Sequence, residues 1–206
     1  MRRRTYAEPM DKRPYHHGDL RAALLARAGE TLREGGVGAL SLRELARDVG
    51  VSPGAPRRHF ASKQVLLDAL ALDGFERLID SLVAARGGEA RPFAERLDAM
   101  ARAYVGFSLS DPALLSLMFS AKHSPEASEG LRDAARRWAE QGLALIRDGQ
   151  SRGEVREGPP DRVALTVLAP LHGYIGLAAG GAPLPQTPDR GLDDVIASVV
   201  RACAPE

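Results

Sequence analysis

The stretch 41–65 constrains the fold of this chain more than any other, because it predicts two short helices joined by a tight turn. Residues 41–50 read SLRELARDVG, and residues 50–65 read GVSPGAPRRHFASKQV. Ser41 and Glu44 have the spacing of a capping box, in which each side chain accepts the other residue's backbone N–H. The apolar positions that follow share one helical face: Leu42, Leu45, Ala46 and Val49. Gly50 then predicts the end of the helix, because glycine enters the left-handed conformation at little cost.

A second short helix is predicted directly after this glycine. Ser52 is placed to cap it, and Pro53 suits its first turn. Arg57, Arg58 and His59 fall within about one helical turn, so at least two of these side chains face outward. The segment is therefore a basic helix on the surface of its unit.

The residues after the basic segment predict how it is anchored and where a third helix starts. Phe60 is the apolar anchor, and Ser62 is expected to cap a helix that begins at Lys63. Units of this kind place one helix in the major groove of DNA. The competing interpretation is a plain pair of helices with surface arginines, and the S-x-x-E spacing alone would not separate the two. The whole succession of caps and stops favours DNA binding.

Residues 18–70 resemble the DNA-binding domain of the TetR/AcrR family of bacterial transcriptional regulators. The matching features are a leading helix over 20–32, the pair Gly35-Gly36, ALSLRELA at 39–46, GVS at 50–52, His59-Phe60, Lys63 and Leu66-Leu67. The chain departs from the family at Pro56, where an aliphatic residue is usual, and at Arg57, where tyrosine is usual. The resemblance implies an all-α fold, with an N-terminal three-helix helix-turn-helix domain joined to a larger helical ligand-binding and dimerisation domain.

The same resemblance divides the chain into three parts and assigns roles to residues of the first two. We expect a basic arm over 1–17, the DNA-binding domain over 18–63 and the effector-binding and dimerisation domain over 64–206. The expected phosphate contacts are Ser41, Arg43, His59 and Lys63, and the expected residues near base edges are Ser52, Pro53, Gly54, Ala55, Arg57 and Arg58. Tyr15 and His16 could touch the DNA backbone or minor groove, or belong to a solvated arm. Whether Arg57 meets a base or a phosphate stays open.

The charge distribution agrees with a front that meets phosphates. Residues 1–63 hold 13 Lys and Arg against 7 Asp and Glu, a balance of +6, and the remaining residues hold 15 against 20, a balance of −5. A basic front and an acidic rear suit a nucleic-acid partner at the front. The single cysteine, Cys203, allows no disulfide within the chain, and the opening MRRR lacks the apolar run of a signal peptide. We therefore expect a cytoplasmic protein.

The rear of the chain predicts helices throughout. The expected helices span 64–85, 92–110, 112–120, 125–152, 160–179 and 188–203, and several begin at a cap residue followed by proline: Asp111-Pro112, Ser124-Pro125 and Thr187-Pro188. Residues 163–188 hold no Asp, Glu, Lys or Arg, which would also fit a membrane span. Four prolines and four glycines interrupt that run, so we expect burial in a dimer and no membrane.

Candidate effector and dimer residues follow from the family resemblance. In the family the rear domain encloses a small-molecule cavity, for which the candidates are Tyr104, Phe107, Met118, Phe119, Trp138 and His172; ordinary core packing is the alternative for each. The last two helices form the family's homodimer interface, with candidates Leu165, Leu168, Ile175, Leu192, Val195, Ile196 and Val199. The sequence APLHG at 169–173 partly matches a Trp-His-Gly signature of one subgroup. The effector is expected to be hydrophobic or amphipathic.

The functional expectation is therefore a dimeric regulator, a repressor released from a palindromic double-stranded operator by a small molecule, with activation left open. An enzyme is the competing class, but the sequence has no G-x-S-x-G elbow and no phosphate-binding glycine loop. His16-His17 lacks a third metal ligand at a helpful spacing, so no metal and no cofactor are expected. A helical adaptor that binds only protein is the other alternative, and the basic front argues against it.

Overall fold

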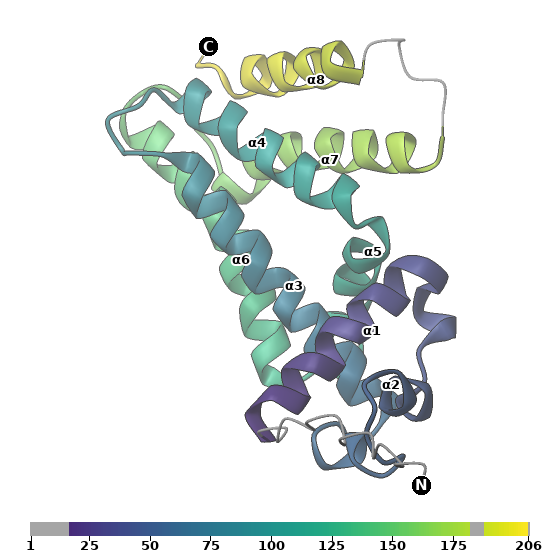
Figure 1. Ribbon diagram of the computed structural model, residues 1–206. Coiled ribbons are helices and arrows are strands. Elements are labelled where there is room, and N and C mark those ends of the chain that lie inside the picture. The colour runs from purple at the N-terminus through teal and green to yellow at the C-terminus, as the bar shows by residue number, and fades with distance from the viewer. Residues whose placement is uncertain (1–16, 182–187, 206) are drawn as a thin grey trace, which may run out of the picture.

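The computed structural model describes residues 17–181 and 188–205, and every regular element in these residues is helical (Figure 1). In chain order the elements are α1 His17–Ala39, α2 Leu42–Asp48, the 3-10 turn η1 Pro56–Arg58, α3 Lys63–Arg86, α4 Phe93–Ser110, α5 Pro112–Ala121, α6 Glu129–Ser151, α7 Pro160–Ala179 and α8 Pro188–Cys203. The all-α prediction is confirmed. Tyr15 and His16 lie outside the described residues.

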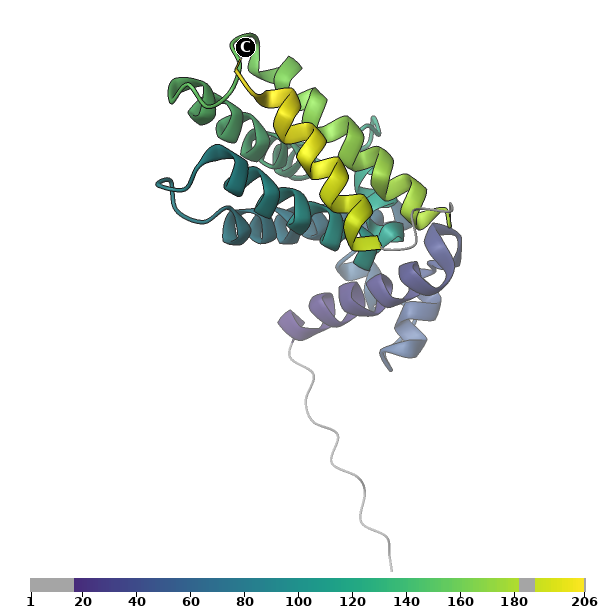
Figure 2. The ribbon, with the colours of Figure 1, turned by 90° about the horizontal axis from the view of Figure 1, so that it is seen from above.

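The helices form a small N-terminal unit and a larger C-terminal bundle that share one helix. α1, α2 and η1 gather around the start of α3, while the rest of α3 packs against α4, α5 and α6 (Figure 1). α7 packs on α4 and α6, and α8 covers α7 and α4 on the outside, as the view from above shows (Figure 2). Because α3 is continuous from Lys63 to Arg86, a displacement in the bundle can be transmitted to the N-terminal unit without crossing a flexible linker.

The core of the N-terminal unit is built from the apolar face that the sequence predicts. Leu45 and Ala46 of α2 are buried, and so is Phe60, which follows η1. The Arg21 guanidinium lies 5.4 Å from the centre of the Phe60 ring, so α1 also covers this anchor. Leu66 of α3 completes the set. This core fixes α2 and the segment after it against α1 and α3.

Several predicted helix ends are confirmed, and three other local predictions are wrong. α7 and α8 have the predicted limits, Ser62 caps α3 by accepting the Val65 N–H (3.2 Å), and Asp111 caps α5 by accepting the Leu114 N–H (3.0 Å). The helix expected from residue 125 begins at Glu129 instead. Asp68 of α3 accepts the Ser128 N–H (2.8 Å) and hydroxyl, so this tertiary contact sets the start of α6.

The second wrong prediction is the capping box of α2. Ser41 has the extended backbone of an N-cap, but its hydroxyl accepts no hydrogen bond from the helix. The Ser41 carbonyl accepts the Leu45 N–H (2.9 Å). Arg43 and Glu44 are exposed, so solvent can satisfy the first-turn donors that the cap would have taken.

The predicted second helix is reduced to a turn and the single 3-10 turn η1. The Ala55 N–H donates to the Ser52 carbonyl (2.9 Å), and the next ladder bonds begin only at Arg58, whose N–H reaches the Ala55 carbonyl (3.2 Å). Pro56 is the physical reason, because proline has no N–H to continue a helix through this point. Ser52 therefore accepts through its carbonyl in a turn and does not cap an α-helix, and Ala55 stands at the N-cap of η1.

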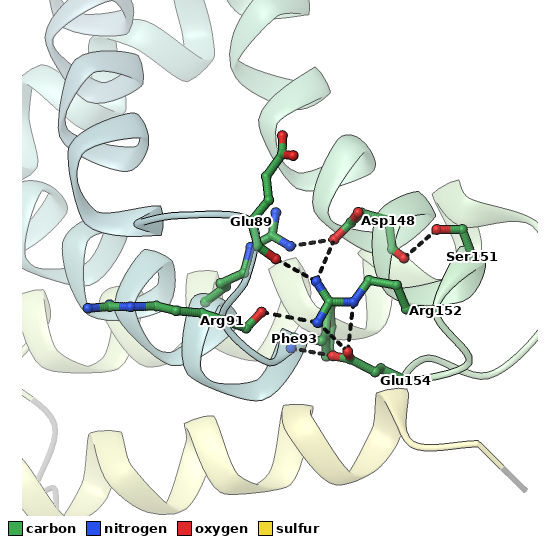
Figure 3. Close-up of polar contacts among 8 residues, drawn as sticks. Glu89, Arg91, Phe93, Asp148, Ser151, Arg152 and Glu154 are labelled. Atoms are coloured by element: carbon green, nitrogen blue, oxygen red, sulfur yellow. Dashed lines mark hydrogen bonds and ion pairs between the residues drawn. The ribbon is translucent and has the colours of Figure 1, made fainter.

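The end of the C-terminal bundle farthest from α2 is closed by a network of ion pairs and hydrogen bonds (Figure 3). Asp148 of α6 pairs with Arg96 of α4, whose side chain is only 3% exposed. Glu154 accepts the Phe93 N–H at 2.5 Å and pairs with Arg152 at 2.5 Å. The hydrogen bond from Phe93 lowers the pKa of Glu154. These contacts tie the start of α4 to the end of α6.

Candidate nucleic-acid interface and apolar cavity

The segment between α2 and α3 presents its basic residues to solvent. Ser52, Pro53, Gly54, Arg57 and Arg58 are exposed, and Ala55, His59 and Lys63 are partly exposed. Pro56 and Phe60 are buried beneath them. The buried pair holds η1 against the core, so the two arginines point away from a fixed support.

The cations of this surface have no carboxylate partner. Among the described residues, no Asp or Glu oxygen lies within 4.0 Å of the charged nitrogens of Arg43, Arg57, Arg58 or Lys63. Arg27 of α1 behaves differently, because it pairs with Glu30 at 2.9 Å and Asp48 at 3.0 Å. An unpaired guanidinium on a fixed turn is free to bind an external anion such as a phosphate. We call Ser41, Arg43, Ser52, Pro53, Gly54, Ala55, Arg57, Arg58, His59 and Lys63 the basic face.

The predicted contact residues come from three neighbouring parts of the N-terminal unit, which are the start of α2, the segment around η1 and the start of α3. Ser41 and Arg43 come from the start of α2, and Lys63 comes from the first position of α3. Arg47 is an exposed residue that the sequence-based prediction missed. It follows Arg43 by four positions, a spacing that places two residues on the same side of a helix. Its pairing with Asp48 at 3.5 Å makes it a weaker anion site than Arg43.

An ion pair joins the N-terminal unit to the C-terminal bundle. Arg33 of α1 lies 3.3 Å from Asp111, which is the N-cap of α5. Asp111 is buried, so its carboxylate is fixed both by this pair and by the Leu114 N–H. The contact gives the bundle a second route to α1, in addition to the continuous α3.

An apolar cavity of about 260 Å³ lies between α4, α6 and α7, with α3 behind it. Its wall is made of Leu82, Leu97, Met100, Ala101, Tyr104, Trp138, Ala139, Gly142, Leu143, Leu145, Ile146, Asp161, Ala164, Leu165, Val167, Leu168 and Leu171. Leu97, Met100, Ala101 and Tyr104 follow the i, i+3, i+4, i+7 spacing of one face of α4. The sequence-based choice of cavity residues relied on large apolar and aromatic side chains and did not use this spacing.

The predicted effector residues divide between the cavity and the packing around it. Tyr104 and Trp138 belong to the wall, while Phe107, Phe119 and His172 do not. Met118 is fully buried and its sulfur would lie 2.7 Å from a Cβ added at Gly74, so it is a packed core residue with no surface for a ligand. The role of Met118 in effector binding stays a prediction, and its packing favours the alternative of an ordinary core residue.

An aromatic cluster stands beside the cavity and includes both aromatic wall residues. The Trp138 ring centre lies 5.2 Å from that of Phe119 and 6.2 Å from that of Tyr104. The Tyr104 hydroxyl is 2.8 Å from His172 Nδ1, although the His172 side chain is exposed and is not a core histidine. Burial raises the pKa of Tyr104, which therefore stays a neutral hydrogen-bonding group.

Lys122 lies against the rings of this cluster and is not part of the cavity wall. Its ammonium lies 4.2 Å from the Phe119 ring centre and 5.3 Å from that of Trp138. Partial burial lowers the pKa of Lys122. The ring faces take the place of a carboxylate as its neighbours, since no ion pair of Lys122 occurs among the described residues.

α7 exposes large apolar side chains, whereas α8 buries Ile196 and Val199. Leu165 (62% exposed) and Leu177 (54% exposed) lie on the open side of α7. Ile175, Ile196 and Val199, which were predicted to meet a partner, are buried within the chain itself, because α8 turns its apolar stripe onto α7 and α4. Their place in a dimer interface stays a prediction. Leu168, Leu192 and Val195 are partly exposed.

α7 is long and apolar enough to cross a membrane by length and composition, and 22% of its apolar window is buried. A single helix of this kind is weak evidence for a membrane span, because the core helix of a soluble protein also meets this criterion. Within residues 17–181 and 188–205, no group of three or more His, Cys, Asp or Glu side chains is placed to hold a metal ion.

Solved structures share this architecture over nearly the whole chain. A protein of unknown function from Rhodococcus sp. RHA1 is 40% identical, with a TM-score of 0.87 over 94% of this chain and 100% of that one. A regulatory protein of the tetR family from Rhodococcus RHA1 (22% identical, TM-score 0.71, 90% and 97% covered) shows the same fold. So does the TetR family transcriptional regulator PfmR from Thermus thermophilus (24% identical, TM-score 0.66, 87% and 96% covered).

The sequence comparisons point the same way. The HTH-type transcriptional regulator Rv1816 of Mycobacterium tuberculosis is 33% identical over 89 residues, which are 43% of this chain and 38% of that protein. The match thus spans well under half of the relative's length. Residues 24–70 match the bacterial regulatory proteins of the tetR family, and residues 97–202 match the tetracyclin repressor-like C-terminal domain. Because these two matches cover more than half of the sequence, the chain belongs to the TetR family of bacterial regulatory proteins.

Proposed function

We propose that this chain is a homodimeric transcriptional regulator that represses from a palindromic DNA operator and is released by a small-molecule effector. The observation that carries the proposal is the basic face, where Arg43, Arg57, Arg58 and Lys63 are unpaired on a fixed support. Phosphate contacts would set the position of the protein on the duplex, and the two arginines of η1 would approach guanine O6 and N7.

The shortness of η1 favours arginine as the residue that contacts base edges. A turn with one 3-10 segment offers fewer outward positions than an α-helix, and Arg57 and Arg58 are consecutive exposed residues on it. Consecutive residues of a 3-10 turn point in different directions, so we propose that Arg58 meets a base edge and that Arg57 binds either a base or the adjacent phosphate. Gly54 and Ala55 are small enough to let the backbone approach the groove.

The proposed dimer uses α7 and α8. Leu165 and Leu177 are large apolar residues left open to solvent on α7, which is the pattern of an unpaired apolar surface. Leu168, Leu192 and Val195 would line the edges of the interface. In a symmetric dimer, two basic faces about 34–36 Å apart would fit successive turns of the major groove.

Effector release would act through the two routes that join the bundle to the N-terminal unit. A ligand between α4, α6 and α7 would press on α3, which continues into the basic face, and on the Arg33–Asp111 contact. A state with wrongly spaced basic faces would then be favoured, with a coupling energy of about 1–3 kcal/mol. We keep the proposed divisions 1–17, 18–63 and 64–206, and we propose a non-enzymatic, cytoplasmic protein.

The proposal is tested by titrating the purified chain onto the duplex that precedes its own gene and onto a scrambled duplex of equal length. Retarded complexes with the first duplex only, formed by two chains per site, are the expected result. Sedimentation without DNA should give a dimer at micromolar concentration. Retardation of neither duplex at low salt would leave an adaptor or an enzyme as the better description.

A further inference from the structure

The described wall of the apolar cavity holds one acidic side chain and no basic side chain. Among the described residues that form it, Asp161 is the only acidic side chain, and no Lys or Arg takes part. Asp161 is exposed on the first turn of α7, one turn before the exposed Leu165, so both belong to the mouth of the cavity. The polar end of any bound molecule would therefore meet a carboxylate.

The carboxylate of Asp161 lies in the first turn of α7, where the helix N-terminus favours a negative charge. No ion pair of Asp161 within 4.0 Å occurs among the described residues. Arg162 is its neighbour in sequence, but consecutive residues of a helix point in different directions. The negative charge at the mouth is thus available to a cation from outside, and it would repel an anion.

The inner wall is apolar and fits the hydrocarbon part of a ligand. Tyr104 and Trp138 contribute aromatic rings to it. The remaining wall residues are aliphatic, and they would bury a hydrocarbon body.

We propose that the effector is an amphipathic cation, with its apolar body in the cavity and its ammonium group at Asp161. The inference rests on the proposed function, in which the cavity receives the effector. A neutral apolar molecule of the same length would bind less tightly, since it would leave the carboxylate without a partner. An apolar acid would bind least, because its carboxylate would approach Asp161.

Trp138 provides the measurement, because it is the single tryptophan of the chain and stands in the cavity wall. Its fluorescence is recorded while the full-length protein is titrated at pH 7 with decan-1-amine, decan-1-ol or decanoic acid, each below the concentration at which it forms micelles. The three molecules share one chain length and differ in the charge of the head group.

Three variants separate the charge from the cavity. Asp161→Asn removes the charge with little change of shape. Asp80→Asn removes an exposed carboxylate of α3 outside the wall, and serves as the matched control. Gly142→Leu fills the cavity, because a Cβ at this wall glycine meets no atom within 4 Å. Circular dichroism checks that each variant is folded.

The expected order of affinity is amine, alcohol, acid, with the amine about fivefold tighter than the alcohol, as suits one exposed charge pair. Asp161→Asn should abolish that difference, Asp80→Asn should keep it, and Gly142→Leu should weaken all three ligands. An acid that binds as tightly as the amine, or an order unchanged by Asp161→Asn, would overturn the inference while alcohol binding still supports the cavity. If no ligand binds the wild type, the proposed effector site fails as well.

Discussion

The arginines at the two ends of the molecule have opposite surroundings. On the basic face, Arg57 and Arg58 are exposed and have no carboxylate within 4.0 Å among the described residues. At the far end of the bundle, Arg96 is buried against Asp148, and Arg152 pairs with Glu154. Arginine side chains thus stabilise the fold at one end of the molecule. At the other end they are left available for an external anion. The partners of the arginines, and not their number, therefore distinguish a binding surface from a structural one.

The largest effect should come from breaking the structural end. Asp148→Ala leaves the buried Arg96 guanidinium without its partner, and we expect a loss of about 2–3 kcal/mol in the free energy of unfolding. The value lies below that for a fully buried pair because Asp148 is 35% exposed. Urea denaturation measures it. Asp73→Asn, at an exposed pair with Arg77, should change stability by less than about 1 kcal/mol. Equal losses in the two variants would remove the distinction.

The basic face should respond in binding and not in stability. Arg58→Ala is expected to weaken operator binding by about 1–3 kcal/mol and to relax base preference at one position. Its unfolding midpoint in urea should match the wild type, because Arg58 is exposed and unpaired. Fluorescence anisotropy on operator variants gives the binding value. Unchanged affinity with reduced stability would move Arg58 to the structural class.

A phosphate contact should be visible in the salt dependence. Lys63→Ala is expected to lower the slope of log affinity against log salt by about 0.9, without altering sequence preference. Lys122→Ala is the matched control at a lysine of the bundle, and its slope should equal that of the wild type. A slope that Lys63→Ala leaves unchanged would exclude this residue from the basic face.

The smallest expected effect is a pH dependence at the structural end. The Phe93 N–H lowers the pKa of Glu154 below its ordinary value of 4.5, so Glu154 contributes stability above that value. The contribution is lost as the pH falls through the lower pKa of the folded state. Glu154→Gln should therefore be less stable than the wild type at pH 6, and the gap should close on acidification. A gap that widens toward pH 3 would contradict the assignment.

The helices were largely predictable from sequence because their signals are local. Asp111 and Ser62 are caps of the predicted kind, and α7 begins at Pro160 as expected. The start of α6 was not predictable, because Asp68 fixes it from a helix distant in sequence. The second α-helix is absent because Pro56 lacks the N–H that would continue it. Proline is tolerated in the first turn of a helix, so the sequence pattern did not reveal this outcome.

The candidate sites were predictable to different degrees for a similar reason. The basic face occupies one short segment of sequence, and a motif can describe it. The cavity wall draws on four helices, so aromatic type alone found Tyr104 and Trp138 but missed Gly142 and Asp161. Burial of Ile196 and Val199 depends on how α8 sits against α7, which the apolar stripe does not specify.

We propose that the unpaired arginines of η1 are the part of this molecule that holds DNA. The most direct measurement compares wild type and the Arg57→Ala/Arg58→Ala double variant by anisotropy on the duplex preceding the gene, at about 50 mM salt where phosphate contacts are strong. We expect saturable wild-type binding and a loss of about a hundredfold or more in the double variant, with an unchanged melting temperature. Equal affinities of the two proteins, or a wild type that ignores the duplex, would contradict it.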